Sequence, residues 1–173
     1  DGWYPVVTIT PKDYEAGLAA VRAAASDAGR DPQSITAAKL LFVVTGHSRG
    51  EVDEALGSPA IKAFALNLPA YVWARHGARH PLGDDFTGLQ DLIPQTLDEQ
   101  TVLSYIADIP PSLVTELVLC GTPDEVIDQA AEWRDHGMRY AVVGNLSSVQ
   151  PSLRRGLAAT IPFAKILRGL RRL

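Results

Sequence analysis

The chain has 173 residues, of which 46% are hydrophobic and 21% charged, so its size and composition suit one globular domain with a buried core. Its net charge of −4 argues against a nucleic-acid-binding protein. Its single cysteine excludes an internal disulfide and fits a reducing, cytoplasmic compartment. No apolar run reaches the ~18 residues of a membrane span, and we expect no targeting segment.

The first predicted element is a β-branched strand over Val6–Ile9, preceded by Asp1-Gly2-Trp3-Tyr4-Pro5. A helix is predicted to follow from Pro11 to a stop at Gly29. The chain begins with Asp1 rather than Met, and the succession of strand and helix recurs along it. We therefore expect a fragment of a repeating β/α architecture.

Three strand-to-helix junctions share one pattern, a hydroxyl residue followed three positions later by an acid. The hydroxyl can accept the N–H of the first helical turn, and the acid can answer from the third position. The pattern predicts helix starts at three pairs: Thr10 with Asp13, Ser48 with Glu51, and Thr122 with Glu125. Apolar strands, Leu40–Val44 and Leu117–Cys120, precede the second and third pairs.

An interruption of about residues 58–112 separates the second and third units. Within it, Ala60–Ala74 is predicted to be one helix, His80–Gly88 a loop, and Asp98–Ala107 a short helix before Pro110-Pro111. An insertion of this length on one edge of a barrel is typically a lid or an interface.

A fourth strand is predicted over Tyr140–Val143, and a last helix over Ser152–Leu173 with a kink at Pro162. The predicted strands are continuously apolar, as in parallel sheets buried on both faces. The pattern favours an α/β fold of about four βα units in one domain, residues 1–173, either half of a (β/α)8 barrel or a doubly wound sheet.

Gly46-His47-Ser48-Arg49-Gly50 matches the G-x-S-x-G nucleophile elbow of serine hydrolases. The simpler interpretation is that Ser48 caps the next helix, since only one strand precedes it. Asp84 or Asp85, then His136, have the chain order of the remaining triad members. We favour the cap and keep the hydrolase as an alternative.

Two other features have weak functional signals. His76 and His80 are four residues apart, but Gly77 and Pro81 interrupt a helix there and no third ligand stands out, so we predict no metal site. Cys120 ends a strand without an evident partner, which favours a small buried hydrophobe over a nucleophile.

Six of the 16 basic residues fall in the last 20 positions. A segment of this kind can lie on an anionic membrane surface. It can equally be a last barrel helix whose cations complement the helix dipole, and this second interpretation is favoured.

Several segments, in this order and spacing, resemble the luciferase-like monooxygenase family of flavin- or deazaflavin-dependent (β/α)8 barrels. They are Asp1–Pro5, Ala28-Gly29-Arg30-Asp31-Pro32, Gly121-Thr122-Pro123-Asp124-Glu125-Val126 and His136-Gly137-Met138-Arg139-Tyr140. The resemblance covers the whole chain and corresponds to the C-terminal half of the barrel. Lys62–Pro69 and His80–Gly83 in the insertion resemble a branch that uses coenzyme F420 to reduce a keto group on a long-chain lipid.

The resemblance implies a fragment of an oxidoreductase that uses F420, or alternatively FMN, on a hydrophobic substrate. In the family, the catalytic side chains come largely from the N-terminal half, so the catalytic residues here are unknown and the fragment is expected to be inactive alone. Eight residues at predicted strand ends are candidates, by position, for cofactor or substrate binding: Trp3, Tyr4, Thr45, His47, Cys120, Gly121, Gly144 and Asn145.

Unpaired strand edges in such a fragment favour a homo-oligomer. They also leave a third alternative, a non-catalytic truncated barrel that binds a partner through those edges.

Overall fold

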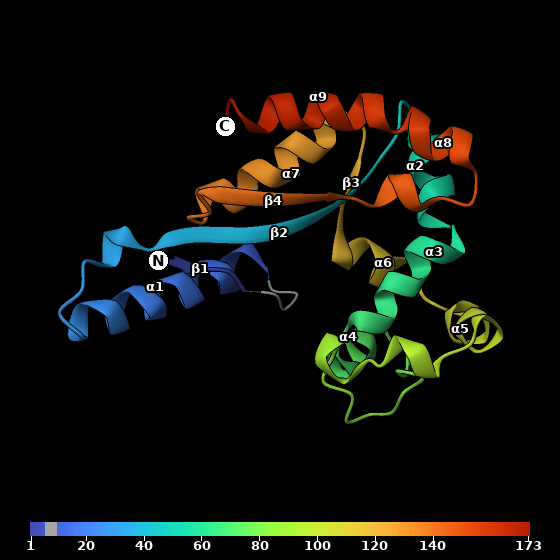
Figure 1. The fold of residues 1–173 in the computed structure, drawn as a ribbon, viewed down its shortest axis with the longest axis horizontal. Coiled ribbons are helices and arrows are strands. Elements are labelled where there is room, and N and C mark those ends of the chain that lie inside the picture. The colour runs from blue at the N-terminus through green and yellow to red at the C-terminus, as the bar shows by residue number, and fades with distance from the viewer. Residues whose placement is uncertain (6–9) are drawn as a thin grey trace.

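The computed structural model describes residues 1–5 and 10–173, so the predicted strand Val6–Ile9 lies outside the described residues. The described part has four parallel strands that form one sheet, with helices around it (Figure 1). The strands are β1 (Gly2–Trp3), β2 (Thr36–Thr45), β3 (Val118–Gly121) and β4 (Tyr140–Asn145). The expected α/β class with a parallel sheet is confirmed.

Strand β2 lies at the centre of the sheet, because all three other strands pair with it. The N–H of Thr36 donates to the carbonyl of Asp1, whereas the N–H of Arg139 donates to the carbonyl of Ala37. Successive residues of a strand direct their hydrogen bonds to opposite edges, so β1 and β4 lie on opposite sides of β2. Strands β3 and β4 both pair with Phe42, so β3 shares the edge of β1.

This pairing differs from consecutive barrel strands, in which β3 would separate β2 from β4. Strand β2 has 10 residues, whereas β3 has 4 and β4 has 6, so β2 has length enough to pair with β1 and β3 in succession on one edge.

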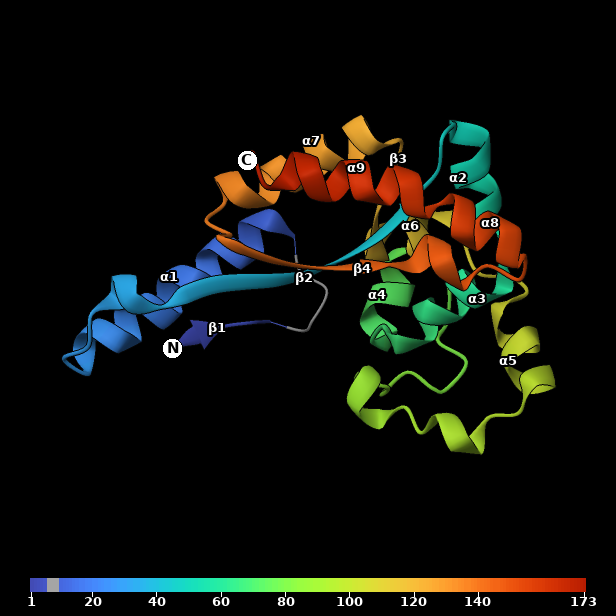
Figure 2. The ribbon, with the colours of Figure 1, turned by 45° about the horizontal axis from the view of Figure 1, so that its top comes forward.

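Three helices cover the face of the sheet from which Leu41 and Val43 project. They are α1 (Pro11–Asp27), α7 (Pro123–Asp135) and α9 (Thr160–Leu170). Helices α7 and α9 run side by side along β4, and α1 lies beneath β2 (Figures 1 and 2). The start of α1 is as predicted, because the Asp13 N–H donates to Thr10 Oγ1 at 3.2 Å and Asp13 Oδ2 accepts the Thr10 N–H at 3.3 Å.

The insertion forms a helical layer at the far end of the sheet. With its neighbours it comprises α2 (Arg49–Leu56), α3 (Pro59–Ala63), α4 (Ala70–Arg75), α5 (Glu99–Ile106) and α6 (Pro111–Leu117), with 3₁₀ turns at Phe64–Asn67, Leu89–Asp91 and Pro94–Thr96. Outside the insertion, another 3₁₀ turn, Pro32–Ser34, precedes β2. This layer has its own apolar core, which includes Ile61, Leu68 and Leu113.

Two predictions for the insertion were wrong. The single helix over Ala60–Ala74 is broken into α3 and α4, because Pro69 has no N–H to donate and holds Leu68 in an extended conformation. Helix α6 was missed because Pro110-Pro111 was interpreted as a break, whereas Pro111 occupies the first helical position, where proline is tolerated.

The last helix is divided into α8 (Leu153–Ala158) and α9 at Ala159, three residues before the expected kink at Pro162. No helix in residues 1–5 and 10–173 is long and apolar enough to cross a membrane. Strand burial is less complete than predicted: Tyr140 and Val142 of β4 are 59% and 39% exposed, so burial on both faces holds only where β2 ends.

Candidate functional site

The carboxyl ends of β2, β3 and β4 meet at one end of the sheet. The strand register places Gly121 opposite Thr45 and Asn145 opposite Val43. Most of the predicted site residues therefore gather there: Thr45, His47, Cys120, Gly121, Gly144 and Asn145. The sequence assigned these residues to strand ends, and parallel strands end on the same side; their role in binding stays a prediction.

Trp3 and Tyr4 do not belong to this group. Trp3 pairs with Ala37 near the other end of β2. Its ring centre lies 4.8 Å from that of Tyr14, and a Cβ on Gly17 would lie 3.0 Å from the indole. Tyr4 is 42% exposed. In this structure Trp3 packs on α1, and its role in the pocket of a complete protein stays a prediction.

A buried polar pair marks the strand ends. The Thr45 N–H donates to Ser147 Oγ at 2.7 Å, and the Ser147 N–H donates to Asn145 Oδ1 at 3.1 Å. Thr45 and Ser147 are 1% and 0% exposed. Thr45 Oγ1 is buried and has no hydrogen-bond partner among the described residues. A buried hydroxyl without a partner is costly, so this atom is available to a ligand.

Ser147 was missed by sequence reasoning. It lies in the 3₁₀ turn Leu146–Val149 directly after β4. The only signal was the polar run Asn145–Ser148 after an apolar strand, which is also typical of an ordinary turn.

Ser48 is a helix cap, as we favoured. Its Oγ accepts the Glu51 N–H at 3.3 Å. The Glu51 carboxylate differs from the prediction, since it accepts the N–H of His47 at 2.7 Å rather than that of Ser48.

The nominated triad partners are occupied elsewhere. Asp84 pairs with Arg79 at 2.8 Å, and His136 Nδ1 lies 2.8 Å from the Glu132 carbonyl oxygen. No histidine in the described part hydrogen-bonds to Ser48. These contacts lend no support to the hydrolase alternative.

Cys120 is half-buried beside α7. The Gln129 side chain accepts the Cys120 N–H at 3.2 Å and donates to the Cys120 carbonyl at 2.9 Å. Burial raises the pKa of the Cys120 thiol, and the nearby Arg49 only partly opposes this. The thiol is therefore a poor nucleophile at neutral pH.

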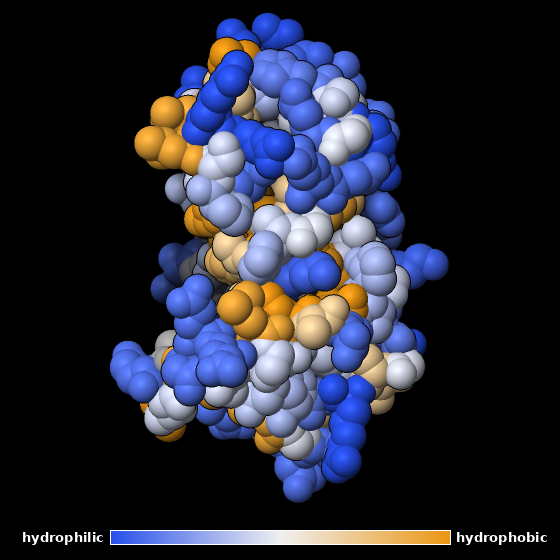
Figure 3. All heavy atoms as spheres, turned by 90° about the vertical axis from the view of Figure 1, so that its right-hand side faces the viewer, coloured by the Kyte–Doolittle hydropathy of each residue, from blue (hydrophilic) through white to orange (hydrophobic). Residues whose placement is uncertain are grey.

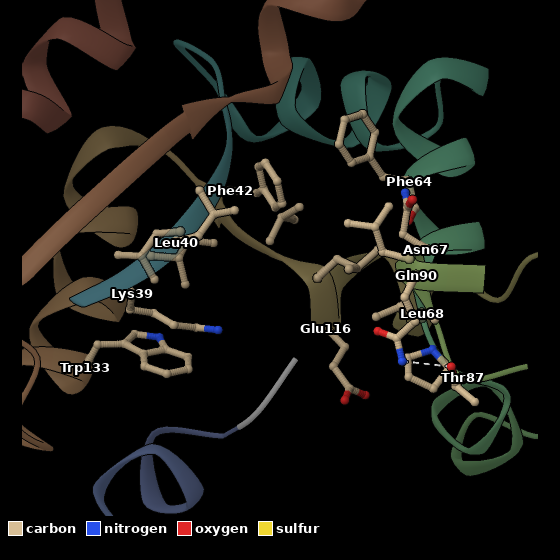
Figure 4. Close-up of a pocket in the computed structure, with 17 residues that line it drawn as sticks. Lys39, Leu40, Phe42, Phe64, Asn67, Leu68, Thr87, Gln90, Glu116 and Trp133 are labelled. Carbon is tan, nitrogen blue, oxygen red and sulfur yellow. Dashed lines mark hydrogen bonds between the residues drawn. The ribbon is translucent and has the colours of Figure 1, made fainter. Parts of the chain in front are cut away.

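A second candidate site is a pocket of about 270 Å³ between β2, the start of β3 and the insertion (Figure 4). Its walls are mainly apolar, with Phe42 and Leu40 from the sheet facing Phe64 and Leu68 from the insertion. None of the eight residues predicted from the sequence lines it. Its polar lining side chains are Lys39, Asn67, Thr87, Gln90 and Glu116.

Lys39 is the most unusual residue of this pocket. It is only 6% exposed, and its Nζ lies 5.4 Å from the centre of the Trp133 ring. Burial lowers the pKa of Lys39 below its ordinary value of 10.5. The sequence contained a signal, since Lys39 is a charged residue directly before the apolar strand Leu40–Val44.

Glu116 extends from α6 into the pocket. It also links α6 to the end of α4. Its carboxylate contacts both Arg75 and His76 Nε2, and His76 Nδ1 lies 2.8 Å from Ser112 Oγ. His80 has different neighbours: it is 2% exposed and stacks on Phe86 with ring centres 4.2 Å apart. The two histidines therefore serve separate contacts within the insertion.

The family model described as luciferase-like monooxygenase matches residues 1–140 of this chain. Phthiodiolone/phenolphthiodiolone dimycocerosates ketoreductase from Mycobacterium tuberculosis H37Rv is 58% identical over 173 residues, which is all of this chain and 45% of that protein. The protein of the same name from Mycobacterium kansasii is 57% identical, again over the whole chain and 47% of the relative. The chain thus spans less than half the length of these relatives.

Solved structures support the fold. An F420-dependent secondary alcohol dehydrogenase aligns with 95% of this chain and 42% of its own, with a TM-score of 0.60 at 16% identity. The F420-dependent tetrahydromethanopterin reductase from Methanopyrus kandleri aligns with 92% of this chain and 43% of its own, with a TM-score of 0.59 at 19% identity. The predicted fold class, part of a TIM barrel, is confirmed. The chain belongs to the luciferase-like monooxygenase family.

Proposed function

We propose that the complete protein containing this chain is an F420-dependent ketoreductase that acts on a hydrophobic, lipid-like substrate. The observation that carries this proposal is the 58% identity, over every residue of the chain, to relatives named as dimycocerosates ketoreductases. FMN is the alternative cofactor, since a riboflavin lyase with modified FMN also aligns with the chain, at a TM-score of 0.53.

The strand ends are the proposed contribution of this chain to the cofactor site. The Thr45 hydroxyl is buried there without a partner among the described residues, which fits a polar atom of a bound ring system. His47, Cys120, Gly121, Gly144 and Asn145 surround the same end. When bound, the deazaflavin supplies the hydride, while these residues orient it and exclude water.

The pocket beside the insertion is the proposed site for an apolar part of the substrate. Its walls include Leu40, Phe42, Phe64 and Leu68, so alkyl groups would be removed from water on binding. The insertion closes this pocket on one side, in agreement with its expected role as a lid or an interface.

Several properties of the chain follow from the same proposal. Alone it does not turn over substrate, because it spans only 45% of the relatives' length and cofactor positioning requires the rest. Open strand edges and exposed apolar residues such as Tyr140 favour a homo-oligomer. A cytoplasmic location fits the single cysteine.

The test is a titration of the full-length protein with F420 and with FMN separately, followed by turnover with a long-chain ketone. We expect tight binding of F420 and reduction of the ketone. Binding of neither cofactor would refute the oxidoreductase, and binding of FMN alone would refute the F420 subgroup.

Trp3→Ala, compared in the same assays, tests the predicted role of Trp3. Unchanged binding and turnover would show that it is only a core residue.

A further inference from the structure

Helices α8 and α9 present an exposed apolar stripe to solvent. Leu153, Leu157 and Ile161 follow one another at intervals of four residues, which places them on one side of the helical segment. They are 78%, 64% and 67% exposed. The opposite side, with Pro162 and Ile166, is buried against the rest of the molecule.

The same segment concentrates positive charge. Residues 151–173 contain six of the 16 basic residues and none of the 20 acidic ones. Arg155 pairs with Glu54 at 2.6 Å and Lys165 with Asp124 at 2.9 Å. The other four cations are exposed and have no carboxylate partner within residues 1–5 and 10–173: Arg154, Arg168, Arg171 and Arg172.

The stripe begins beside the candidate cofactor site. Helix α8 packs against the 3₁₀ turn Leu146–Val149, whose Ser147 accepts the hydrogen bond from Thr45. Figures 1 and 2 show α8 beside the short helical turn that follows β4. The end of the molecule that includes α8, drawn in Figure 3, shows apolar areas within a largely polar surface.

We infer that α8 and α9 dock this protein on an anionic phospholipid surface. The apolar residues Leu153, Leu157 and Ile161 would enter the boundary between headgroups and acyl chains, and the four arginines would contact lipid phosphates. This geometry brings the strand ends close to the bilayer, where a lipid substrate is dissolved. The inference deepens the proposed function and depends on it for its biological meaning.

Charge favours a membrane over a second copy of the chain. Two copies that met through residues 151–173 would bring together cations with no acidic residue in either segment. An anionic bilayer supplies the opposite charge along the whole stripe.

The experiment is vesicle co-sedimentation of the full-length protein, without cofactor. Vesicles of phosphatidylcholine alone are compared with vesicles that contain about 30 mol% phosphatidylglycerol, a content that gives a negative surface potential. We expect binding to the anionic vesicles only, with weakening at high salt. Because no cofactor is used, failure here leaves the ketoreductase proposal to its own test.

Two variants separate the apolar and the charged contributions. Leu157→Glu/Ile161→Glu and Arg171→Glu/Arg172→Glu should each lower partitioning by about tenfold or more. Leu103→Glu is the matched control, since Leu103 is an exposed leucine of α5, 44% exposed and outside the stripe, and it should bind like the wild type. Circular dichroism of each variant verifies that it is folded.

Four outcomes would overturn the inference. They are no binding to either kind of vesicle, equal binding to neutral and anionic vesicles, wild-type binding by the stripe variants, and dimers abolished by Leu157→Glu/Ile161→Glu in a protein that binds no vesicles. The last outcome would assign the stripe to a second copy.

Discussion

Thr45 and Ser147 are 102 positions apart in the chain, yet the Thr45 N–H donates to Ser147 Oγ at 2.7 Å in a fully buried setting. This bond joins the end of β2 to the turn after β4, on the opposite side from β3. It therefore holds together the strand ends at which we place the cofactor.

Ser147→Ala should lower the free energy of unfolding by about 1–3 kcal/mol, because it leaves the buried Thr45 N–H without an acceptor. Urea unfolding measures the change. Ser148→Ala is the control: its Oγ donates to the Asn145 carbonyl at an exposed position, so its loss should cost no more than about 0.5 kcal/mol. Equal effects of the two substitutions would contradict the importance of the buried bond.

Thr45→Val tests the role of the Thr45 hydroxyl. Valine has nearly the same shape and removes Oγ1, which lacks a partner in the described part of the chain, so stability should stay equal or rise by about 1 kcal/mol. In the full-length protein the same change should weaken F420 binding measurably by fluorescence titration. A stable variant with unchanged cofactor affinity would exclude Thr45 from the site.

Ser48→Ala should cost about 1 kcal/mol through loss of the cap that accepts the Glu51 N–H. Any esterase activity of the preparation should be unaffected. A fluorophosphonate probe provides the opposing measurement, since stoichiometric labelling of Ser48 would restore the hydrolase alternative.

Lys39→Met should change how stability depends on pH. Because burial lowers the pKa of Lys39 from 10.5, the unfolded chain binds more protons than the folded chain between the lowered pKa and 10.5. The free energy of unfolding of the wild type therefore increases with rising pH in that window. The methionine variant lacks this increase. Urea unfolding from about pH 7 to about pH 10 should show the stability of the wild type increasing relative to that of the variant. Parallel profiles would refute the lowered pKa.

Gly169→Ala should destabilise the contact between α9 and α7, since an added methyl would overlap Cδ1 of Ile127. The gain of about 1 kcal/mol in helix propensity is not expected to compensate for this overlap. A double-mutant cycle with Ile127→Ala measures the coupling by urea unfolding. If the cost of Gly169→Ala is the same in the Ile127→Ala background, the two residues do not contact as the structure shows.

Outside the insertion, the sequence alone determined much of the local structure. Caps and prolines at Thr10, Ser48 and Pro123 set the helix starts, and apolar runs set the strands, because both depend on neighbours a few residues away. It also assigned Thr45, Gly121 and Asn145 to strand ends, and the strand register brings these ends together because parallel strands end on one side.

Only the tertiary structure decided the remainder. The pairing of β4 with β2 and the bond between Thr45 and Ser147 depend on partners distant in the chain. The pocket around Lys39 likewise combines β2 with the insertion. Local sequence propensity cannot predict such contacts. Their free energy comes from burial and hydrogen bonding between segments that only the completed fold brings together.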